Sequence, residues 1–288
     1  MKSLQIVECP RDAFQGIQEH IPTEKKIAYI NQLLRCGFHS IDFGSFVSPK
    51  MIPQMADTVQ VLKGLVMEGS TSKLLAIVAN LRGAQEAAAY DEITYIGFPF
   101  SISETFQKRN TNAGMEEALT RIEEIQSICM RSNKTMVVYI SMAFGNPYGD
   151  PWNADLATAW AKNLAGMGIQ IISLADTVGV STPANIRTLF GTLIPELPTI
   201  TIGAHLHSPP AQADEKIAAA LQSGCTRFDA AVKGFGGCPM ASDALTGNIA
   251  TEMLLQQMNN HGLKHGVDEA SFAASMMLAG TTFPPAHA

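Results

Sequence analysis

The stretch Thr199-Ile-Thr-Ile-Gly-Ala-His-Leu-His207 decides how the rest of the chain is interpreted. Its alternating β-branched residues predict a β-strand over residues 199–205 that ends in two histidines one residue apart. Side chains on a strand alternate between its faces, so we expect His205 and His207 to point the same way. A lone buried histidine is usually a core residue. A pair of imidazoles at the end of a buried strand instead favours a metal site.

On both sides of this stretch the chain repeats one unit, a short apolar run followed by apolar residues at helical spacing. The expected strands cover residues 4–9, 39–43, 73–79, 92–96, 135–141, 170–174, 199–205 and 225–228. The expected helices cover residues 23–36, 48–62, 80–90, 115–131, 153–167, 183–193 and 211–222, then a segment from about residue 248, and an extra C-terminal helix at 267–279.

This alternation predicts an α/β protein with a parallel sheet, and eight units predict closure into a (β/α)8, or TIM, barrel. A doubly wound open sheet is the competing fold. The Gly-x-Gly-x-x-Gly turn that such a sheet usually carries after its first strand is absent here. No linker-like stretch separates the units, so we expect a single catalytic domain over residues 1–288.

Composition narrows the class of protein further. The 288 residues are 46% hydrophobic and 16% charged, which is typical of a globular protein with a large core. The net charge of −6 includes no basic tract, so nucleic acid is not an expected partner. Apolar runs are too short for a membrane span, and we expect no membrane partner. Five cysteines without a Cys-x-x-Cys motif and the lack of a signal peptide predict a cytoplasmic protein.

Polar residues gather where the expected strands end, which is the face that carries the chemistry of TIM barrels. They end or follow the first strand (Arg11, Asp12), the second (Asp42, Ser45), the third (Asn80), the fifth (Ser141), the sixth (Ser173, Asp176, Thr177) and the seventh (His205, His207), while Cys238 and Asn248 follow the eighth.

A divalent ion bound by His205 and His207 would need a balancing charge, and Asp12 is the nearest candidate. The alternative for Asp12 is a salt bridge with Arg11, but adjacent residues on an extended chain point apart. With the amide oxygen of Asn248, these ligands suit octahedral Mg²⁺ or Mn²⁺ better than zinc. Asn248 could equally be the N-cap of the following helix, since Asn is a favoured cap.

Cys238 stands in Gly234-Phe-Gly-Gly-Cys-Pro239, and three glycines before it predict a mobile flap that can bring a thiol over a site. The alternative is a small buried cysteine in a tight turn. For Asp176 and Glu252 a structural role is also open, in which backbone amides satisfy each carboxylate.

Three segments resemble the 3-hydroxy-3-methylglutaryl-CoA lyase family. Pro10-Arg-Asp-Ala-Phe-Gln15 is similar to its Pro-Arg-Asp-Gly-Leu-Gln motif, and Ser45-Phe-Val-Ser-Pro-Lys50 with Pro53-Gln-Met55 matches the loop after its second strand. Gly234–Pro239 resembles the glycine-rich loop that carries the catalytic cysteine of the family. Leu174–Gly179 and Gly247–Glu252 also fit. The resemblance covers nearly the whole chain.

The resemblance implies a metal-dependent carbon–carbon lyase that cleaves a 3-hydroxyacyl-CoA to acetyl-CoA and a keto acid, acetoacetate in the named case. It implies that Mg²⁺ or Mn²⁺ is bound by Asp12, His205, His207 and Asn248. Arg11 would stabilise the enolate and Cys238 would deliver a proton to it. The remaining implied roles are catalytic or positioning (Asp42, His205, Asp176, Glu252) and substrate-binding (Arg11, Gln15, Ser45, Asn80, Ser173, Thr177).

Beyond the CoA of its substrate the reaction needs no organic cofactor, and we expect a homodimer. Lys108 and Arg109, in a polar loop expected at residues 107–112, are weak candidates for holding the CoA phosphates, because basic residues in such loops are usually just solvated.

The chain departs from the family pattern at several positions. Asp42 replaces a glutamate, so a carboxylate shorter by about 1.5 Å must be compensated. Gln18 replaces a lysine, Ile17 replaces a glutamate, and Ser208-Pro-Pro follows the histidine pair where the family has Asp-Thr. These departures affect the expected acyl group rather than the reaction type.

Three rival functions remain. Condensing enzymes of the same barrel group lack a flap cysteine and usually carry an added C-terminal domain. Metal-dependent hydrolase barrels place His-x-His on the first strand. A non-catalytic acyl-CoA-binding barrel would not need to retain every proposed ligand, and all of them are present here.

Overall fold

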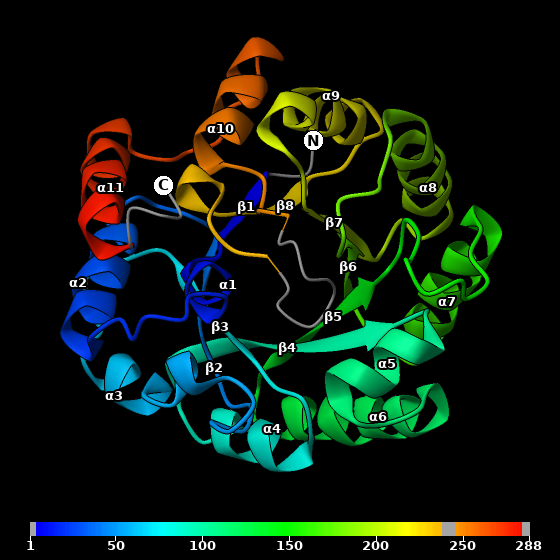
Figure 1. Ribbon diagram of the computed structural model, residues 1–288, viewed down its shortest axis with the longest axis horizontal. Coiled ribbons are helices and arrows are strands. Elements are labelled where there is room, and N and C mark those ends of the chain that lie inside the picture. The colour runs from blue at the N-terminus through cyan, green and yellow to red at the C-terminus, as the bar shows by residue number, and fades with distance from the viewer. Residues whose placement is uncertain (1–3, 238–245, 284–288) are drawn as a thin grey trace.

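The computed structural model describes residues 4–237 and 246–283, which form a closed barrel of eight parallel strands in sequence order (Figure 1). Strand β8 pairs with β1 and completes the ring. The strands are β1 (Gln5–Glu8), β2 (Ser40–Ser45), β3 (Lys73–Ile77), β4 (Ile93–Ser101), β5 (Thr135–Ser141), β6 (Ile171–Asp176), β7 (Thr201–Leu206) and β8 (Arg227–Ala230). The predicted TIM barrel is therefore confirmed.

Helices surround this barrel (Figure 1). They are α1 (Pro10–Gln15), α2 (Thr23–Leu33), α3 (Thr58–Lys63), α4 (Leu81–Ala88), α5 (Glu104–Thr111), α6 (Met115–Arg131), α7 (Ala154–Gly166), α8 (Pro183–Glu196), α9 (Pro210–Gln222), α10 (Thr251–Asn260) and α11 (Glu269–Thr282), with two short 3-10 turns, η1 (Pro53–Met55) and η2 (Val232–Gly234). The expected C-terminal helix is α11, which packs against α2. None of the helices in the described ranges is long and apolar enough to cross a membrane.

Two segments, one expected to be extended and the other a loop, are helices instead. Residues 10–15 form α1, because Pro10 at its first position has the backbone angle that a helix requires. Residues 107–112 belong mostly to α5. The Ser103 side chain caps that helix by accepting a hydrogen bond from the backbone of Phe106, and Asn112 ends it in the left-handed conformation.

Two helix starts were predicted too early. The helix expected from residue 48 begins only at Thr58, after the short turn η1, because Pro53 cannot occupy a helix interior. The helix expected from Asn248 begins at Thr251 with Ala250 at the N-cap, so Asn248 is not a helix cap.

The apolar core lies mainly between the strands and the surrounding helices. A smaller apolar cluster groups residues of β3, β5 and β6, namely Leu75, Ile77, Val137, Tyr139 and Ile171. Strands β2 and β8 instead bury charged residues, among them Asp42, Arg227 and Asp229. The barrel therefore has an apolar side and a strongly polar side.

Candidate active site

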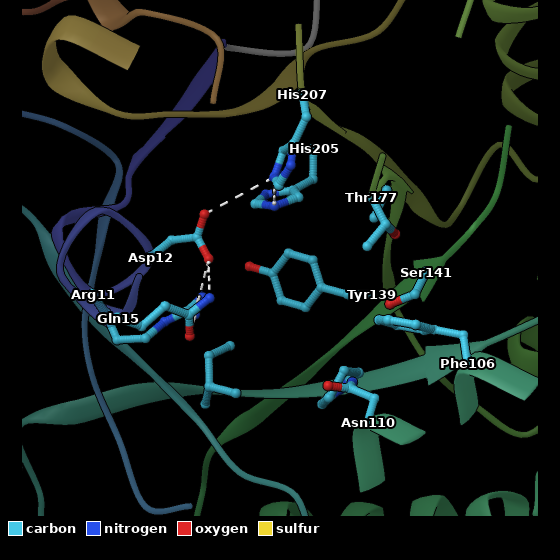
Figure 2. A pocket seen from close by; sticks show the side chains of 13 residues that line it. Arg11, Asp12, Gln15, Phe106, Asn110, Tyr139, Ser141, Thr177, His205 and His207 are labelled. Carbon is cyan, nitrogen blue, oxygen red and sulfur yellow. Dashed lines mark hydrogen bonds and ion pairs between the residues drawn. The ribbon is translucent and has the colours of Figure 1, made fainter. Parts of the chain in front are cut away.

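One cavity opens where the C-terminal ends of the strands meet α1 and α5 (Figure 2). Its volume is about 120 Å³. Residues on or next to α1, α5 and strands β3 to β7 line it, namely Arg11, Asp12, Gln15, Ile77, Pro99, Phe106, Asn110, Tyr139, Ser141, Ala175, Thr177, His205 and His207. This is the face on which TIM barrels carry their chemistry.

His205 and His207 both line this cavity, which confirms that the two rings point the same way. Their Nε2 atoms lie 3.2 Å apart, and Nε2 of His207 lies 3.9 Å from Oδ2 of Asp12. His205 belongs to β7, whereas His207 lies just beyond it and forms an antiparallel bridge with Asn248. Two imidazoles and a carboxylate therefore converge on one point.

The side-chain amide of Asn248 is oriented so that its oxygen is free to bind a ligand. Its Nδ2 atom donates to Oδ2 of Asp12 at 2.6 Å and to the backbone carbonyl of Phe235 at 2.9 Å. Its Oδ1 atom is buried and has no hydrogen-bond partner among the described residues. A buried polar atom without a partner is rare and calls for an explanation, and an amide oxygen of this kind is a good ligand for a hard cation.

The other ring nitrogen of His205 faces a second carboxylate. Nδ1 of His205 lies 3.2 Å from Oδ2 of Asp229, which is fully buried on β8. Burial disfavours the charged ring, but the hydrogen bond and the charge of Asp229 outweigh it and raise the pKa of His205. This carboxylate–histidine pair leaves Nε2 with its lone pair turned toward the cavity, the arrangement typical of a metal-binding histidine.

The second histidine is held neutral. Burial, followed by the charge of His205, lowers the pKa of His207 to about 4. A neutral imidazole is the form that binds a metal. Its Nδ1 atom is also buried without a hydrogen-bond partner among the described residues.

Arg11 and Asp12 lie side by side on α1 and form a salt bridge of 3.1 Å between Nη1 and Oδ1. The expectation that they point apart was wrong, because it assumed an extended chain where the structure has a helix. Asp12 nevertheless keeps its ligand role open, since its Oδ2 atom faces Asn248 and His207. Burial would raise the pKa of Asp12, but Arg11 and the two histidines lower it to about 2.

Asp42 holds the other side of the Arg11 guanidinium. Its Oδ2 atom lies 2.5 Å from Nη2 and 2.9 Å from Nε of Arg11, while Gln15 accepts from Nη1 at 2.7 Å. Burial raises the pKa of Asp42 to about 6, although Arg11 works in the opposite direction. The guanidinium is therefore fixed in position at the edge of the cavity.

These side chains fit a divalent cation. Ligand atoms of Asp12, His205 and His207 all lie within 4.8 Å of one another. Together with Oδ1 of Asn248 they supply two nitrogens, one carboxylate oxygen and one amide oxygen. This donor set, with water or substrate oxygens, suits Mg²⁺ or Mn²⁺.

The remaining substrate-binding candidates divide into two groups. Gln15 and Thr177 line the cavity, and their role in substrate binding stays a prediction. Ser45, Asn80 and Ser173 do not. The hydroxyl of Ser45 donates to the Ile77 carbonyl, Asn80 caps α4 through the backbone amide of Gly83, and Ser173 is buried within β6.

Asp176 and Glu252 also lie away from the cavity lining. Asp176 accepts hydrogen bonds from the backbone amides of Val180 and Ser181 and pairs with Lys216 at 3.2 Å. Glu252 accepts from the backbone amide of Lys233 at 3.1 Å. These contacts match the structural alternative for both carboxylates. Cys238 lies outside the described residues.

The sequence patterns do not identify several residues that line the cavity. Tyr139 presents its hydroxyl to the middle of the cavity and packs edge-on against His205, with ring centroids 5.6 Å apart (Figure 2). Phe106 and Asn110 reach the cavity from α5. Tyr139 lies two residues before Ser141 on β5, so the strand period places both side chains on the same face and could have predicted Tyr139. Phe106 and Asn110 lie on α5, part of which the sequence predicts to be a loop.

Comparison with known proteins shows the family to which the chain belongs. The family model described as HMGL-like matches residues 4–277. The cytoplasmic 3-hydroxy-3-methylglutaryl-CoA lyase of Rattus norvegicus is 39% identical over 92% of this chain and 77% of its own length.

Two solved structures are similar throughout. The Bacillus subtilis HMG-CoA lyase has a TM-score of 0.90 at 33% identity and covers 98% of this chain and 94% of its own. An HMG-CoA lyase from Acinetobacter baumannii, in complex with coenzyme A and 3-methylmalate, has a TM-score of 0.88 at 28% identity, covering 96% and 92%.

Proposed function

Because this chain belongs to the HMGL-like family, we propose that it cleaves 3-hydroxy-3-methylglutaryl-CoA to acetyl-CoA and acetoacetate. The observation that carries the proposal is the convergence of Asp12, His205, His207 and Asn248 beside Arg11 at the mouth of the barrel. The family is one of carbon–carbon lyases, and the retained ligand set supports an enzyme rather than a binding protein. The A. baumannii structure with coenzyme A supports an acyl-CoA substrate.

Asp12, His205, His207 and Asn248 would hold the ion, and this set of two nitrogens and two oxygens, without sulfur, favours Mg²⁺ or Mn²⁺. When bound there, a divalent cation supplies Lewis acidity and a fixed point for substrate oxygens. The chain contributes the orientation of each ligand. Asp229 fixes His205, and the Phe235 carbonyl with Asp12 fixes the amide of Asn248.

The reaction removes the proton of the C3 hydroxyl, breaks the C2–C3 bond and leaves the electron pair on the thioester as an enolate. C3 becomes the ketone carbon of acetoacetate, and C2 must take up a proton to give acetyl-CoA. Arg11 is held at the cavity edge by Asp42 and Gln15, where its positive charge can stabilise the enolate oxygen. One such contact is worth roughly 3 kcal/mol of the barrier.

The proton donor to C2 is Cys238 in this proposal, which rests on the likeness of residues 234–239 to the glycine-rich loop of the family. The stem of that loop is tied to the metal ligands, since the Phe235 carbonyl accepts a hydrogen bond from Asn248. Tyr139 adds a hydroxyl that faces the cavity, and the Thr177 hydroxyl, which accepts from the Met142 amide, can still donate to substrate.

The CoA portion is expected to leave the cavity past α5, which contributes Phe106 and Asn110 to the lining. Lys108 and Arg109 lie on the same helix. Lys108 pairs with Glu104 and is largely exposed, and Arg109 lies over the ring of Tyr148. Because α5 carries both cations and also lines the cavity, we propose that they hold the CoA phosphates. A cytoplasmic location is supported by relatives that carry that word in their names, and the homodimer stays a prediction.

A product assay tests the proposal. With Mg²⁺ or Mn²⁺ added, the protein should release acetyl-CoA and acetoacetate from 3-hydroxy-3-methylglutaryl-CoA faster than from homologues with other 3-alkyl groups. Excess chelator should abolish turnover. His207→Ala should do the same, whereas His261→Ala removes an exposed imidazole and serves as the matched control. Undiminished turnover in chelator, or in His207→Ala, would refute the metal-dependent mechanism.

A further inference from the structure

Arg227, at the start of β8, is a fully buried charge without a hydrogen-bonding partner. Its exposed fraction is 0%, and Nε, Nη1 and Nη2 all lack partners among the described residues. Burying a charge in this way opposes folding strongly, and native proteins rarely keep such a group without a reason. The arginine therefore calls for an explanation beyond packing.

The surrounding strands accommodate this side chain. Arg227 pairs with Gly203 of β7, and a Cβ atom at Gly203 would lie 3.1 Å from Cδ of Arg227 and 2.6 Å from the hydroxyl of Ser173. The guanidinium carbon lies 5.9 Å from the ring centroid of Tyr95, within reach of a cation–π contact. The glycine thus leaves room for the arginine between β6, β7 and β8.

Arg227 lies directly beneath the active site. Asp229, which holds His205, follows it by two residues on the same strand, a rise of about 6.6 Å. Its charge acts on two tyrosines of the barrel, Tyr95 and Tyr139, lowering the pKa of each against the effect of burial. Since Tyr139 lines the cavity, the field of Arg227 extends into the site.

The buried charges around the site do not balance. Three carboxylates (Asp12, Asp42, Asp229) face two guanidiniums (Arg11, Arg227), and Asp176 is already neutralised by Lys216. Glu8 is uncharged at neutral pH because burial raises its pKa to about 8. A divalent cation would turn the single excess negative charge into a single excess positive charge. One carboxylate on the substrate would then make the loaded site neutral.

We propose that Arg227 is a specificity-determining residue, whose buried charge biases the metal-loaded site toward an acyl thioester that carries a free carboxylate. The inference rests on the proposed function and extends it. Among the described residues Arg227 neither lines the cavity nor hydrogen-bonds to a proposed metal ligand, so it acts through its field. A unit charge about 10 Å away in a protein interior changes a binding equilibrium by roughly tenfold.

This role predicts opposite effects on two ligands. Without the charge of Arg227, a divalent cation is repelled less and should bind more tightly, while an anionic substrate is attracted less and should bind more weakly. The fold should also become more stable, because an unpaired buried charge has been removed. A residue needed only for packing would give the reverse, a less stable protein with weaker metal binding.

The experiment compares Arg227→Met and Arg227→Gln, which both remove the charge, with the parent protein. Lys73→Met is the matched control, since Lys73 is an exposed cation at the start of β3. Isothermal titration of the metal-free proteins with Mn²⁺, without substrate, should show about 100-fold tighter binding in the two uncharged variants, because a divalent ion interacts twice as strongly as a unit charge. Lys73→Met should bind Mn²⁺ as the parent does.

The KM for 3-hydroxy-3-methylglutaryl-CoA should rise by about tenfold in the uncharged variants, and the melting temperature should increase. Unchanged or weaker Mn²⁺ binding in the uncharged variants would overturn the inference. The titration with Mn²⁺ needs no turnover. If the parent protein cleaves no acyl-CoA, the proposed function fails while the effect of Arg227 on the cation is still measured.

Discussion

Replacing Glu8 with glutamine should remove a fall in stability that the protein otherwise undergoes between about pH 5 and pH 8. Glu8 is fully buried on β1, where Oε1 accepts from the Val232 amide at 2.8 Å and Oε2 from the Thr251 hydroxyl at 2.6 Å. Burial raises its pKa from 4.5 to about 8, and these two hydrogen bonds oppose the shift only partly. The folded protein therefore holds a proton that the unfolded chain releases.

The direction and size of the effect follow from this difference. A carboxyl whose folded pKa is raised stabilises the protein fully below the unfolded value, and this stability is lost as pH rises through the folded value. At pH 7, about 2.5 pH units above its unfolded pKa, Glu8 is ionised in the unfolded chain, which stabilises the unfolded state. In the folded protein Glu8 is still mostly protonated at this pH, so the folded state gains almost no such stabilisation. At about 1.4 kcal/mol per unit, the folded protein loses roughly 3 kcal/mol between pH 4 and pH 7 through this one group.

Glutamine at position 8 can keep both contacts, since its oxygen still accepts from the Val232 amide and its NH₂ group can donate to the Thr251 hydroxyl. The assay is urea unfolding of the parent and Glu8→Gln at several pH values from 5 to 8. The variant should lose less stability across that range, while Glu116→Gln, an exposed change on α6, should follow the parent. Parallel pH profiles for the parent and Glu8→Gln would refute the reasoning.

Three further predictions concern the site. Cys238→Ala should abolish turnover and leave acyl-CoA binding largely intact, because only the proton donor is lost; near-normal kcat would exclude the thiol from the mechanism. Asp229→Asn should weaken Mn²⁺ binding by about 10- to 100-fold, as measured by titration, because the amide no longer fixes the ring of His205; an unaltered dissociation constant would contradict the role of this carboxylate. Lys108→Ala/Arg109→Ala should raise the KM for the acyl-CoA by removing two cations from the cavity rim, and an unchanged KM would count against a phosphate contact.

Much of the fold could be predicted from the sequence because the strand and helix periods are clear in a barrel. The helix expected at residues 115–131 and the strand expected at 135–141 coincide with α6 and β5. The errors occurred where a single residue overrides the local pattern. Pro10 starts a helix in what resembles a loop, and Pro53 interrupts what resembles one continuous helix.

The sequence predicts which proposed metal ligands come together in the candidate site, but not which of the other polar residues line the cavity. The ligand set was visible because each ligand follows a strand, and the ends of parallel strands in a barrel share one face. Ser45, Asn80 and Ser173 also follow or end strands, but their side chains bond to the backbone or lie within the barrel wall. Sequence position gives the level of a residue in the barrel. It does not show whether the side chain faces the cavity, which depends on pleat and local turns.

Asp229 and Arg227 escaped notice for the opposite reason. Both lie within a short strand whose sequence predicts only a buried strand of the barrel. The pairing of β7 with β8 in the closed barrel is what brings Asp229 to His205. Whether a buried charge has a partner is a property of the tertiary structure. No pattern within residues 225–230 could have shown that, among the described residues, Asp229 has a partner in His205 whereas Arg227 has no hydrogen-bond partner.

The barrel closure also explains how Asp42 can replace the longer glutamate of the family. A continuous chain of contacts runs from Phe235 through Asn248, Asp12 and Arg11 to Asp42, linking the segment after β8 to β2 across β1. Asp42 stands at the far end of this chain and contacts the guanidinium rather than the ligand cluster. Arginine carries several donors on a long side chain, so Nη2 and Nε of Arg11 still reach the shorter Asp42 carboxylate, at 2.5 and 2.9 Å. The shortened side chain therefore leaves the ligands of the proposed ion where the histidine pair requires them.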